Sequence, residues 1–202
     1  MSSPDFERAR QYALDRLERE LSPALVYHSL VHTRDDVGPA AERLADLEGV
    51  TGEARLLLLT AAYFHDIGFT LQREDHEALG AGIVREVLPG FGYSPEQVEA
   101  VASLLLATRL PQQPKGLLEA ILNDADLDVL GRDDFWTRQL DLRSEWSRFG
   151  QATTDHEWYV IQLAFQREHQ YFTEAARRLR SAKKLEIVAR LAELADGQPD
   201  GA

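Results

Sequence analysis

The segment Ala61-Ala62-Tyr63-Phe64-His65-Asp66-Ile67-Gly68 contains the most informative pattern in this 202-residue chain. The residues before His65 are almost all apolar, which predicts a helix buried near the centre of a helical protein. Neighbouring side chains on a regular helix diverge by about 100°, so His65 and Asp66 can reach one metal ion only near a helix end. Gly68 predicts such an end. Burying an imidazole beside a carboxylate is unfavourable without compensation, so we expect a metal ion there, although an ordinary terminal His with an exposed Asp has the same local sequence.

The rest of the chain also repeats its apolar residues every three to four positions, and no segment alternates as a strand does. We therefore predict an all-α fold. The expected helices cover about residues 6–21, 30–47, 53–66, 76–87, 95–108, 117–127 and 133–149, with longer helices over 155–195. Ser94, Pro95 and Gln97 predict a capped helix start. The length fits one domain over residues 1–195, and residues 196–202 are expected to form a flexible tail.

The composition limits the classes of partner and compartment. There are no cysteines, which excludes disulfides and thiolate metal sites. The formal charge of −12 argues against duplex nucleic acid, because binding a phosphate backbone depends on basic surface. No apolar stretch is long enough to span a bilayer, and no signal pattern opens the chain. We expect a cytoplasmic protein without membrane contact, and a homodimer is possible.

Two further segments carry candidate ligands. His28 and His32 stand four residues apart, and on a helix they would share one face. They could bind a metal together, or His28 could face a substrate. Both could also be ordinary surface or capping residues. Farther along, Asp124, Asp126 and Asp128 crowd three negative charges among apolar residues, which a cation would relieve. A solvated acidic turn is the alternative.

In combination, His32, His65-Asp66 and Asp126 form the ordered pattern H…HD…D. The chain here resembles the HD-domain superfamily of metal-dependent phosphohydrolases, over about residues 24–150. The phrases YHSLVHTRDDV, AAYFHDIGF, HEALGAGI and LNDADLDVLGRDDFW resemble one bacterial branch of predicted HD phosphohydrolases. The resemblance implies an HD-domain helical bundle whose helices supply four metal ligands, with residues 151–195 as additional C-terminal helices.

Carried over residue by residue, the resemblance implies His32, His65, Asp66 and Asp126 as metal ligands. Asp126 fits the ligand position better than Asp124, which would then orient a ligand or a bound water. The segment Tyr27-His28-x-x-x-His32 is similar to one in cyclic-nucleotide phosphodiesterases, where the first histidine protonates the leaving group. That similarity implies His28 as general acid, with a structural role as the alternative. Ser29 replaces the asparagine of that segment, so only the histidines carry over.

Two residues outside the four ligands remain candidates for substrate contacts. His76 resembles the extra histidine with which some HD proteins hold a second metal. The later histidine that such proteins supply is absent from the matching stretch, Leu106-Ala107-Thr108-Arg109. We therefore favour one tightly held ion, with His76 as a substrate contact or part of a weak second site. Arg109 is a candidate contact for a substrate phosphate. His169 lies in an amphipathic stretch and fits a packed or capping residue.

These residues predict hydrolysis of a phosphomonoester or phosphodiester, and we expect a nucleotide as the small-molecule substrate. The cofactor would be one divalent ion, Mn²⁺, Fe²⁺, Mg²⁺, Co²⁺ or Ni²⁺, with Mn²⁺ or Fe²⁺ favoured for mixed nitrogen and oxygen ligands. Asp66 would bind the ion and accept a proton from the attacking water. Two alternatives remain: a non-catalytic metal- or ligand-binding HD module, and an HD-type di-iron oxygenase.

Overall fold

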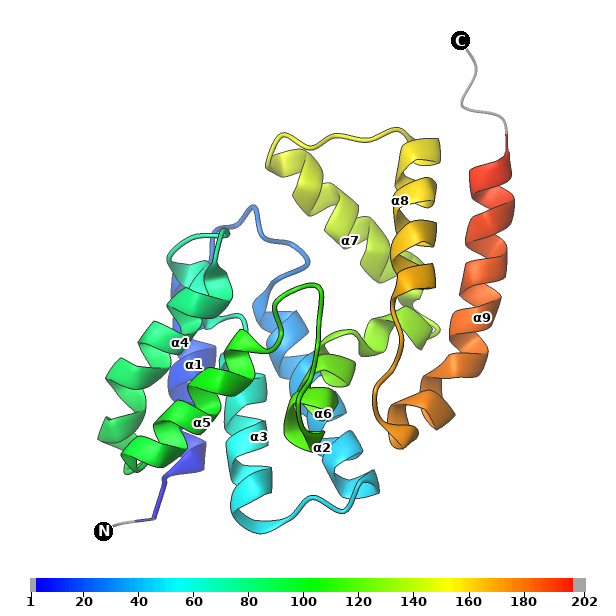
Figure 1. Cartoon of the computed structure of the whole chain (residues 1–202). Coiled ribbons are helices and arrows are strands. Elements are labelled where there is room, and N and C mark those ends of the chain that lie inside the picture. The colour runs from blue at the N-terminus through cyan, green and yellow to red at the C-terminus, as the bar shows by residue number, and fades with distance from the viewer. Residues whose placement is uncertain (1–2, 198–202) are drawn as a thin grey trace.

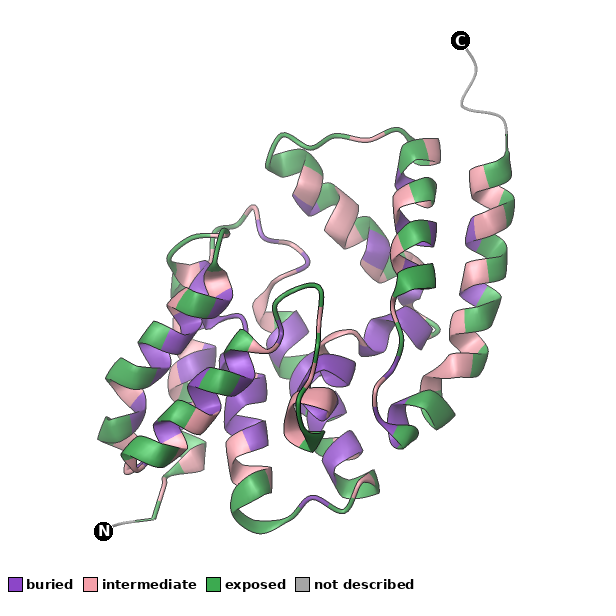
Figure 2. Ribbon diagram, viewed as in Figure 1, coloured by how far each residue is buried: buried purple, intermediate pink, exposed green. Residues whose placement is uncertain are grey.

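The apolar segment before His65 forms α3 (Gly52–Phe64), the helix at the centre of the fold. In the computed structural model, which describes residues 3–197, α3 packs against the two α-helices that precede it in sequence and against two later ones (Figure 1). Leu58, Ala61, Ala62 and Phe64 are fully buried, and Figure 2 shows buried residues gathered around this helix. An all-round apolar helix is stable only with neighbours on every side, as observed here.

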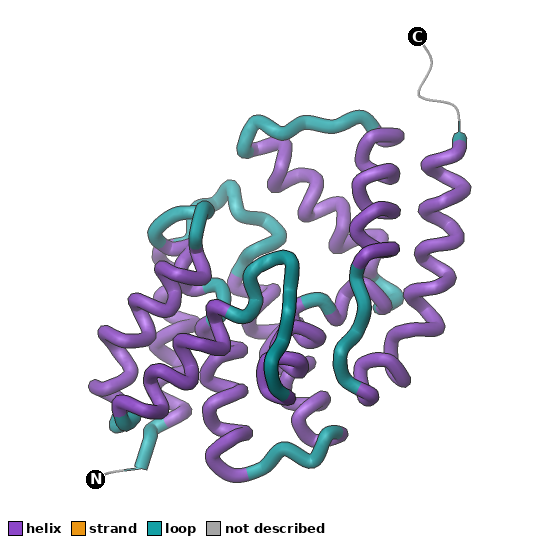
Figure 3. The backbone as a smooth tube through the Cα atoms, viewed as in Figure 1, coloured by secondary structure: helices purple, strands orange, loops and turns teal. Residues whose placement is uncertain are grey.

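The all-α prediction is confirmed: residues 3–197 form helices and loops and contain no strand (Figure 3). The α-helices of these residues are α1 (Phe6–Glu20), α2 (Gly38–Leu47), α3 (Gly52–Phe64), α4 (His76–Val87), α5 (Pro95–Leu106), α6 (Leu117–Asp126), α7 (Phe135–Arg148), α8 (Asp155–Glu168) and α9 (Glu174–Asp196). Short helical turns join some of them: η1 (His32–Val37), η2 (Ile67–Thr70), η3 (Leu88–Phe91) and η4 (Asp128–Gly131). Within residues 3–197, the helices are all too short or too polar to cross a bilayer.

The predicted start of α5 is present in full. The Ser94 side chain accepts from the backbone N–H of Gln97, and the Gln97 side chain accepts from the backbone N–H of Ser94. Pro95 occupies the first helical position, where its missing N–H costs nothing. Such local signals fix a helix end because both partners lie within one turn of chain.

The segment before η1 differs from the expectation. Residues 22–29 form turns rather than a helix, so His28 lies outside any helix. His32 then opens η1, a π-helical turn that runs directly into α2. The two histidines still lie close, with ring centroids 6.1 Å apart, but they do not share a helix face.

The C-terminal part is broken between α8 and α9 by the extended residues 169–173. Asp124 stabilises this break, because its carboxylate accepts from the backbone N–H groups of Phe172 and Thr173 and from the Thr173 hydroxyl. Thr173 in turn caps α9. The helix α9 ends at Asp196, and residues 198–202 of the predicted tail lie outside the described residues.

Asp128 fastens the C-terminal helices to the rest of the molecule. Its side chain is 3% exposed and forms ion pairs with Arg43 of α2, at 3.1 Å, and Arg180 of α9, at 2.7 Å. Burying one carboxylate between two guanidinium groups satisfies its oxygens. This contact holds α9 against η4, the turn that follows α6, and therefore close to the candidate site described next.

Candidate metal centre

The end of α3 delivers His65 and Asp66. The helix ends at Phe64, His65 keeps helical angles, and Asp66 has left them, with φ −97° and ψ 5°. The predicted helix end near Gly68 is therefore present. Gly68 also permits a close approach of η2 to α4, because a Cβ there would lie 1.9 Å from the carbonyl oxygen of His76. This approach sets His76 beside Asp66, with His76 Nε2 3.9 Å from Asp66 Oδ1.

His32 of η1, His65 and Asp66 at the end of α3, and Asp126 at the end of α6 meet at one place. His32 Nε2 lies 3.2 Å from Asp126 Oδ1 and 3.8 Å from Asp66 Oδ2. His65 Nε2 lies 3.2 Å from Asp66 Oδ2 and 3.6 Å from Asp126 Oδ1. One ligand atom each from His32, His65 and Asp66 lies within 4.8 Å of the others. The sequence-predicted ligands thus share one small, mostly buried space.

The donor atoms of this group suit a divalent cation. His65 Nδ1 bonds the carbonyl oxygen of Ala62, which leaves the lone pair of Nε2 for a ligand bond. His65 Nε2 and Asp66 Oδ2 are buried 3.2 Å apart, but neither atom is aligned for a hydrogen bond with the other or with any further described residue. Unpaired buried polar atoms are rare and unfavourable, and an ion between them would satisfy both. Imidazole nitrogen with carboxylate oxygen is a donor set for Mn²⁺, Fe²⁺ and similar ions.

The electrostatics of the group also favour a cation. Burial lowers the pKa of His32, but the carboxylates of Asp126 and Asp36 outweigh burial and raise it to about 9. Burial raises the pKa of Asp66, yet the surrounding imidazoles, His65 foremost, hold it well below the usual range of a carboxyl group. The carboxylates therefore stay negative and draw protons onto the imidazoles. A metal ion would replace those protons.

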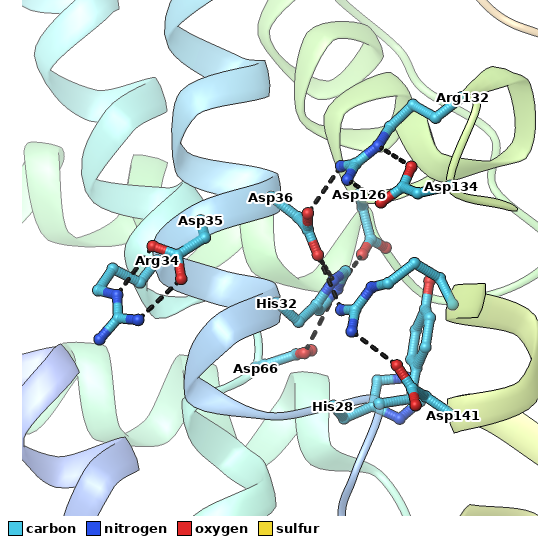
Figure 4. A network of polar contacts seen from close by, with 12 residues as sticks. His28, His32, Arg34, Asp35, Asp36, Asp66, Asp126, Arg132, Asp134 and Asp141 are labelled. Atoms are coloured by element: carbon cyan, nitrogen blue, oxygen red, sulfur yellow. Dashed lines mark hydrogen bonds and ion pairs between the residues drawn. The ribbon is translucent and has the colours of Figure 1, made fainter. Parts of the chain in front are cut away.

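A second layer of charge supports His32 (Figure 4). Asp36 Oδ2 lies 3.8 Å from His32 Nδ1, on the side away from Asp66. Arg132, directly after η4, and Arg138 of α7 pair with Asp36 at 2.7 Å and 2.8 Å. A carboxylate behind a ligating histidine fixes the orientation of its ring and increases its basicity. Neither Asp36 nor its arginines were candidates in the sequence, because they are far apart along the chain.

His28 lies at the edge of this group and is oriented by Glu145 of α7. His28 Nδ1 lies 2.6 Å from Glu145 Oε1, which leaves Nε2 without a protein partner among these contacts. Phe69 packs flat between two imidazoles, 4.7 Å from the His28 ring and 3.9 Å from the His76 ring. Sequence reasoning did not identify Glu145. In the sequence, Glu145 is one of several acidic residues in amphipathic helices, and nothing near it in the chain distinguishes it from the rest.

A cavity of about 240 Å³ opens beside the group. Its lining includes Asp66 and Asp126 together with His28, His76 and Arg109. Arg109 is half-exposed and pairs with Asp75 at 2.7 Å, so its guanidinium stands at the rim. Five of the residues predicted from the sequence therefore line one cavity, whose size admits a small polar group, while His32 and His65 lie behind its wall.

Asp124 does not belong to this cavity, and its expected contact with a ligand is corrected. Both of its oxygens accept from residues 172 and 173, and it is fully buried. Burial raises its pKa, and these hydrogen bonds lower it in part. Two residues along a helix turn through about 200°, so Asp124 and Asp126 point to opposite sides of α6. Asp126 faces the metal ligands, and Asp124 faces the α8–α9 junction.

Comparison with known proteins agrees with this geometry. Residues 36–128 match the HD domain family, a range that includes His65, Asp66 and Asp126 and begins just after His32. The chain is also similar to a predicted HD superfamily hydrolase from an uncultured Thermotogales bacterium, known from a crystal structure. The two are 25% identical, with a TM-score of 0.60, and the match covers 94% of this chain and 93% of that one. No curated protein matches the sequence.

Proposed function

Because the chain is an HD-domain protein, we propose that it hydrolyses a phosphate ester, a phosphomonoester or phosphodiester of a nucleotide, with one divalent metal ion. The HD-domain match and the similarity to a predicted HD hydrolase support a metal-dependent hydrolase in general. The observation that carries the proposal is the pair of unpartnered buried atoms, His65 Nε2 and Asp66 Oδ2, beside His32. Mn²⁺ or Fe²⁺ suits these donors best.

The ligands in this proposal are His32, His65, Asp66 and Asp126. A bound divalent ion would lower the pKa of water toward neutrality and neutralise charge on the phosphoryl oxygens. Asp66 accepts the proton of the attacking water. This role requires an ionised carboxylate, and the imidazoles around Asp66 keep it ionised by holding its pKa low against the effect of burial.

His28 protonates the leaving oxygen. Its Nδ1 is held by Glu145, so the proton on that nitrogen stays in place while Nε2 exchanges its own. Arg109 and His76 line the same cavity and bind the remaining phosphoryl oxygens. Each of these residues has one task, and none requires a covalent intermediate on the protein.

The test begins with metal analysis of protein purified without added metal, followed by a phosphatase and phosphodiesterase panel with that ion. His32→Ala should lose metal and activity together. His28→Ala should keep its metal and lower kcat by about 10²–10⁴-fold, the usual effect of removing a general acid. The loss should be smaller for p-nitrophenyl esters, whose leaving group needs little protonation.

The outcomes separate the alternatives. His156→Ala, on α8 and outside the cavity, is the matched control and should change neither metal content nor kcat. Metal binding without hydrolysis of any ester would overturn the proposed activity and favour a binding module. Loss of metal from His28→Ala would overturn the role of His28 and make it a ligand.

A further inference from the structure

A second cavity adjoins the one at the metal ligands. It has a volume of about 400 Å³, within the range of roughly 300–1,000 Å³ typical of small-molecule sites. Leu110 and Leu127 line both cavities, so the two meet across these side chains. Leu127 directly follows the ligand Asp126. A molecule whose phosphate lies at the metal ligands would therefore extend toward this second cavity.

The walls of the second cavity are flat and largely apolar. Phe165 of α8 and Phe172 of the α8–α9 junction line it, together with Leu110 and Leu127. The His169 ring lies nearly parallel to that of Phe165, with an interplanar angle of 20° and centroids 6.4 Å apart. Aromatic faces of this kind bind planar heterocycles by stacking.

Polar atoms without partners accompany these aromatic faces. Gln112 Nε2 and both ring nitrogens of His169 are buried and have no hydrogen-bond partner among the described residues. Burial, with a smaller effect of Lys184, lowers the pKa of His169 to about 3. The imidazole is therefore neutral and offers one donor and one acceptor. Gln112 and His169 both line the cavity.

Building on the proposed phosphohydrolase function, we propose that the second cavity binds the nucleobase of the substrate while its phosphate lies at the metal ligands. A nucleobase has two apolar faces for Phe165 and Phe172 and a polar edge for Gln112 and His169. A hydrocarbon group would leave those polar atoms unsatisfied, which is unfavourable in a buried site. A sugar alone would leave the aromatic side chains Phe165 and Phe172 without a stacking partner, so the substrate class that fits both features is a nucleoside phosphate.

The first experiment compares substrates. The kcat/KM for nucleoside 5′-monophosphates should exceed that for ribose 5-phosphate, which has no base, by about tenfold or more, in line with the effect of one stacked base. Gln112→Ala and Phe165→Leu should each remove most of this preference by lowering kcat/KM for the nucleotides toward the value for ribose 5-phosphate. Gln113→Ala is the matched control: this neighbour lines another cavity and should keep the preference.

The second experiment measures binding without hydrolysis. Calorimetry with adenosine, guanosine, cytidine and uridine should detect binding of at least one nucleoside, weakened about tenfold or more by Gln112→Ala, a loss typical of contacts to one base. Ribose should not bind. If no nucleoside binds and nucleotides are hydrolysed no faster than ribose 5-phosphate, the nucleobase assignment is overturned while the phosphohydrolase proposal stands. If nucleosides bind in a Gln112-dependent way but no ester is hydrolysed, the assignment stands and the hydrolase proposal fails.

Discussion

His28 Nδ1 lies 2.6 Å from Oε1 of Glu145, a carboxylate that is completely buried. The other oxygen, Oε2, accepts from the backbone N–H groups of Tyr27 and His28 at 2.9 Å and 3.0 Å. One side chain of α7 therefore fixes both the ring and the backbone of a segment that has no helix to hold it. Glu145 therefore positions His28 but does not itself line the cavity beside the metal ligands.

Glu145→Gln should keep the metal but weaken both stability and turnover. The amide cannot accept through both of its end groups, so the free energy of unfolding should fall by about 1.5–3 kcal/mol, the scale of one charged hydrogen bond. The kcat should fall most for alkoxide leaving groups, as in His28→Ala. In a double-mutant cycle, adding Glu145→Gln to His28→Ala should reduce kcat little further. Fully additive losses would mean that Glu145 acts elsewhere.

Asp124→Asn and Asp126→Asn should separate stability from metal binding. Asp126 faces the other ligands, with Oδ1 3.2 Å from His32 Nε2, so its variant should lose metal in elemental analysis. Asp124 instead accepts three hydrogen bonds at the start of α9. Its variant should retain metal and lose about 1–3 kcal/mol of stability, because a buried acceptor loses charge. Metal loss from Asp124→Asn at full stability would contradict these assignments.

Gly68→Ala should disrupt the site by contact alone. The new Cβ would lie 1.9 Å from the His76 carbonyl oxygen and 2.9 Å from the Gly80 nitrogen. Both are backbone atoms, so relieving the clash requires η2 and α4 to move apart. Such overpacking costs about 1–3 kcal/mol or more, and it should also lower metal affinity by moving Asp66. Gly82 is an exposed residue of α4, and a Cβ there meets no atom within 4 Å. Gly82→Ala should therefore raise the free energy of unfolding by about 0.5–1 kcal/mol. Thermal melts of both variants provide the comparison.

Removal of the metal should lower the melting temperature. Without an ion, the negative charges of Asp66 and Asp126 face each other across a mostly buried space, and the elements that carry them lose a shared link. A metal ion that binds only the native state raises the free energy of unfolding by about 2.7 kcal/mol when its free concentration is a hundred times its Kd. Chelation should therefore reduce the Tm, and Mn²⁺ should restore it. An unchanged Tm in protein proven free of metal would speak against a metal site of this kind.

His169 should make stability depend on pH below neutrality. Burial, with Lys184, lowers its folded pKa to about 3, against 6.5 in the unfolded chain. Between these two pKa values only the unfolded state binds the proton, so a falling pH shifts the equilibrium toward the unfolded state. Well above pH 6.5, His169 is neutral in both states and does not lower the free energy of unfolding. On going from there to pH 5, protonation of His169 in the unfolded chain should lower that free energy by about 2 kcal/mol. Urea unfolding at both pH values should show a smaller decrease in His169→Gln than in the parent chain.

The parts of the fold that sequence could predict are those decided within one turn of chain. The capping box of Ser94 and Gln97 and the helix end after Phe64 both depend on near neighbours. The gathering of His32, His65, Asp66 and Asp126 followed from a resemblance to a family rather than from periodicity. Their roles as ligands stay predictions until the metal is measured.

The remaining features depend on partners far along the chain. Glu145 meets His28 across 117 residues, and Asp36 meets Arg132 across 96. No local sequence pattern predicts such pairs, because the residues next to a charged side chain do not indicate whether it contacts water or a distant side chain. The break at residues 169–173 is similar, since it depends on Asp124. The different sides taken by Asp124 and Asp126 follow from helix geometry only once the neighbours of α6 are known.

The π-helical turn η1 has a consequence for how this chain can change in length. Such a turn amounts to an α-helix that carries one additional residue, with a wider backbone ring there. Deleting one residue between His32 and Gly38 would restore ordinary α-helical winding and rotate His32 by about 100° relative to α2. The His32 imidazole would then no longer lie beside the carboxylates of Asp66 and Asp126. Substitutions in this turn change only side chains, whereas a one-residue deletion would change the direction in which His32 points.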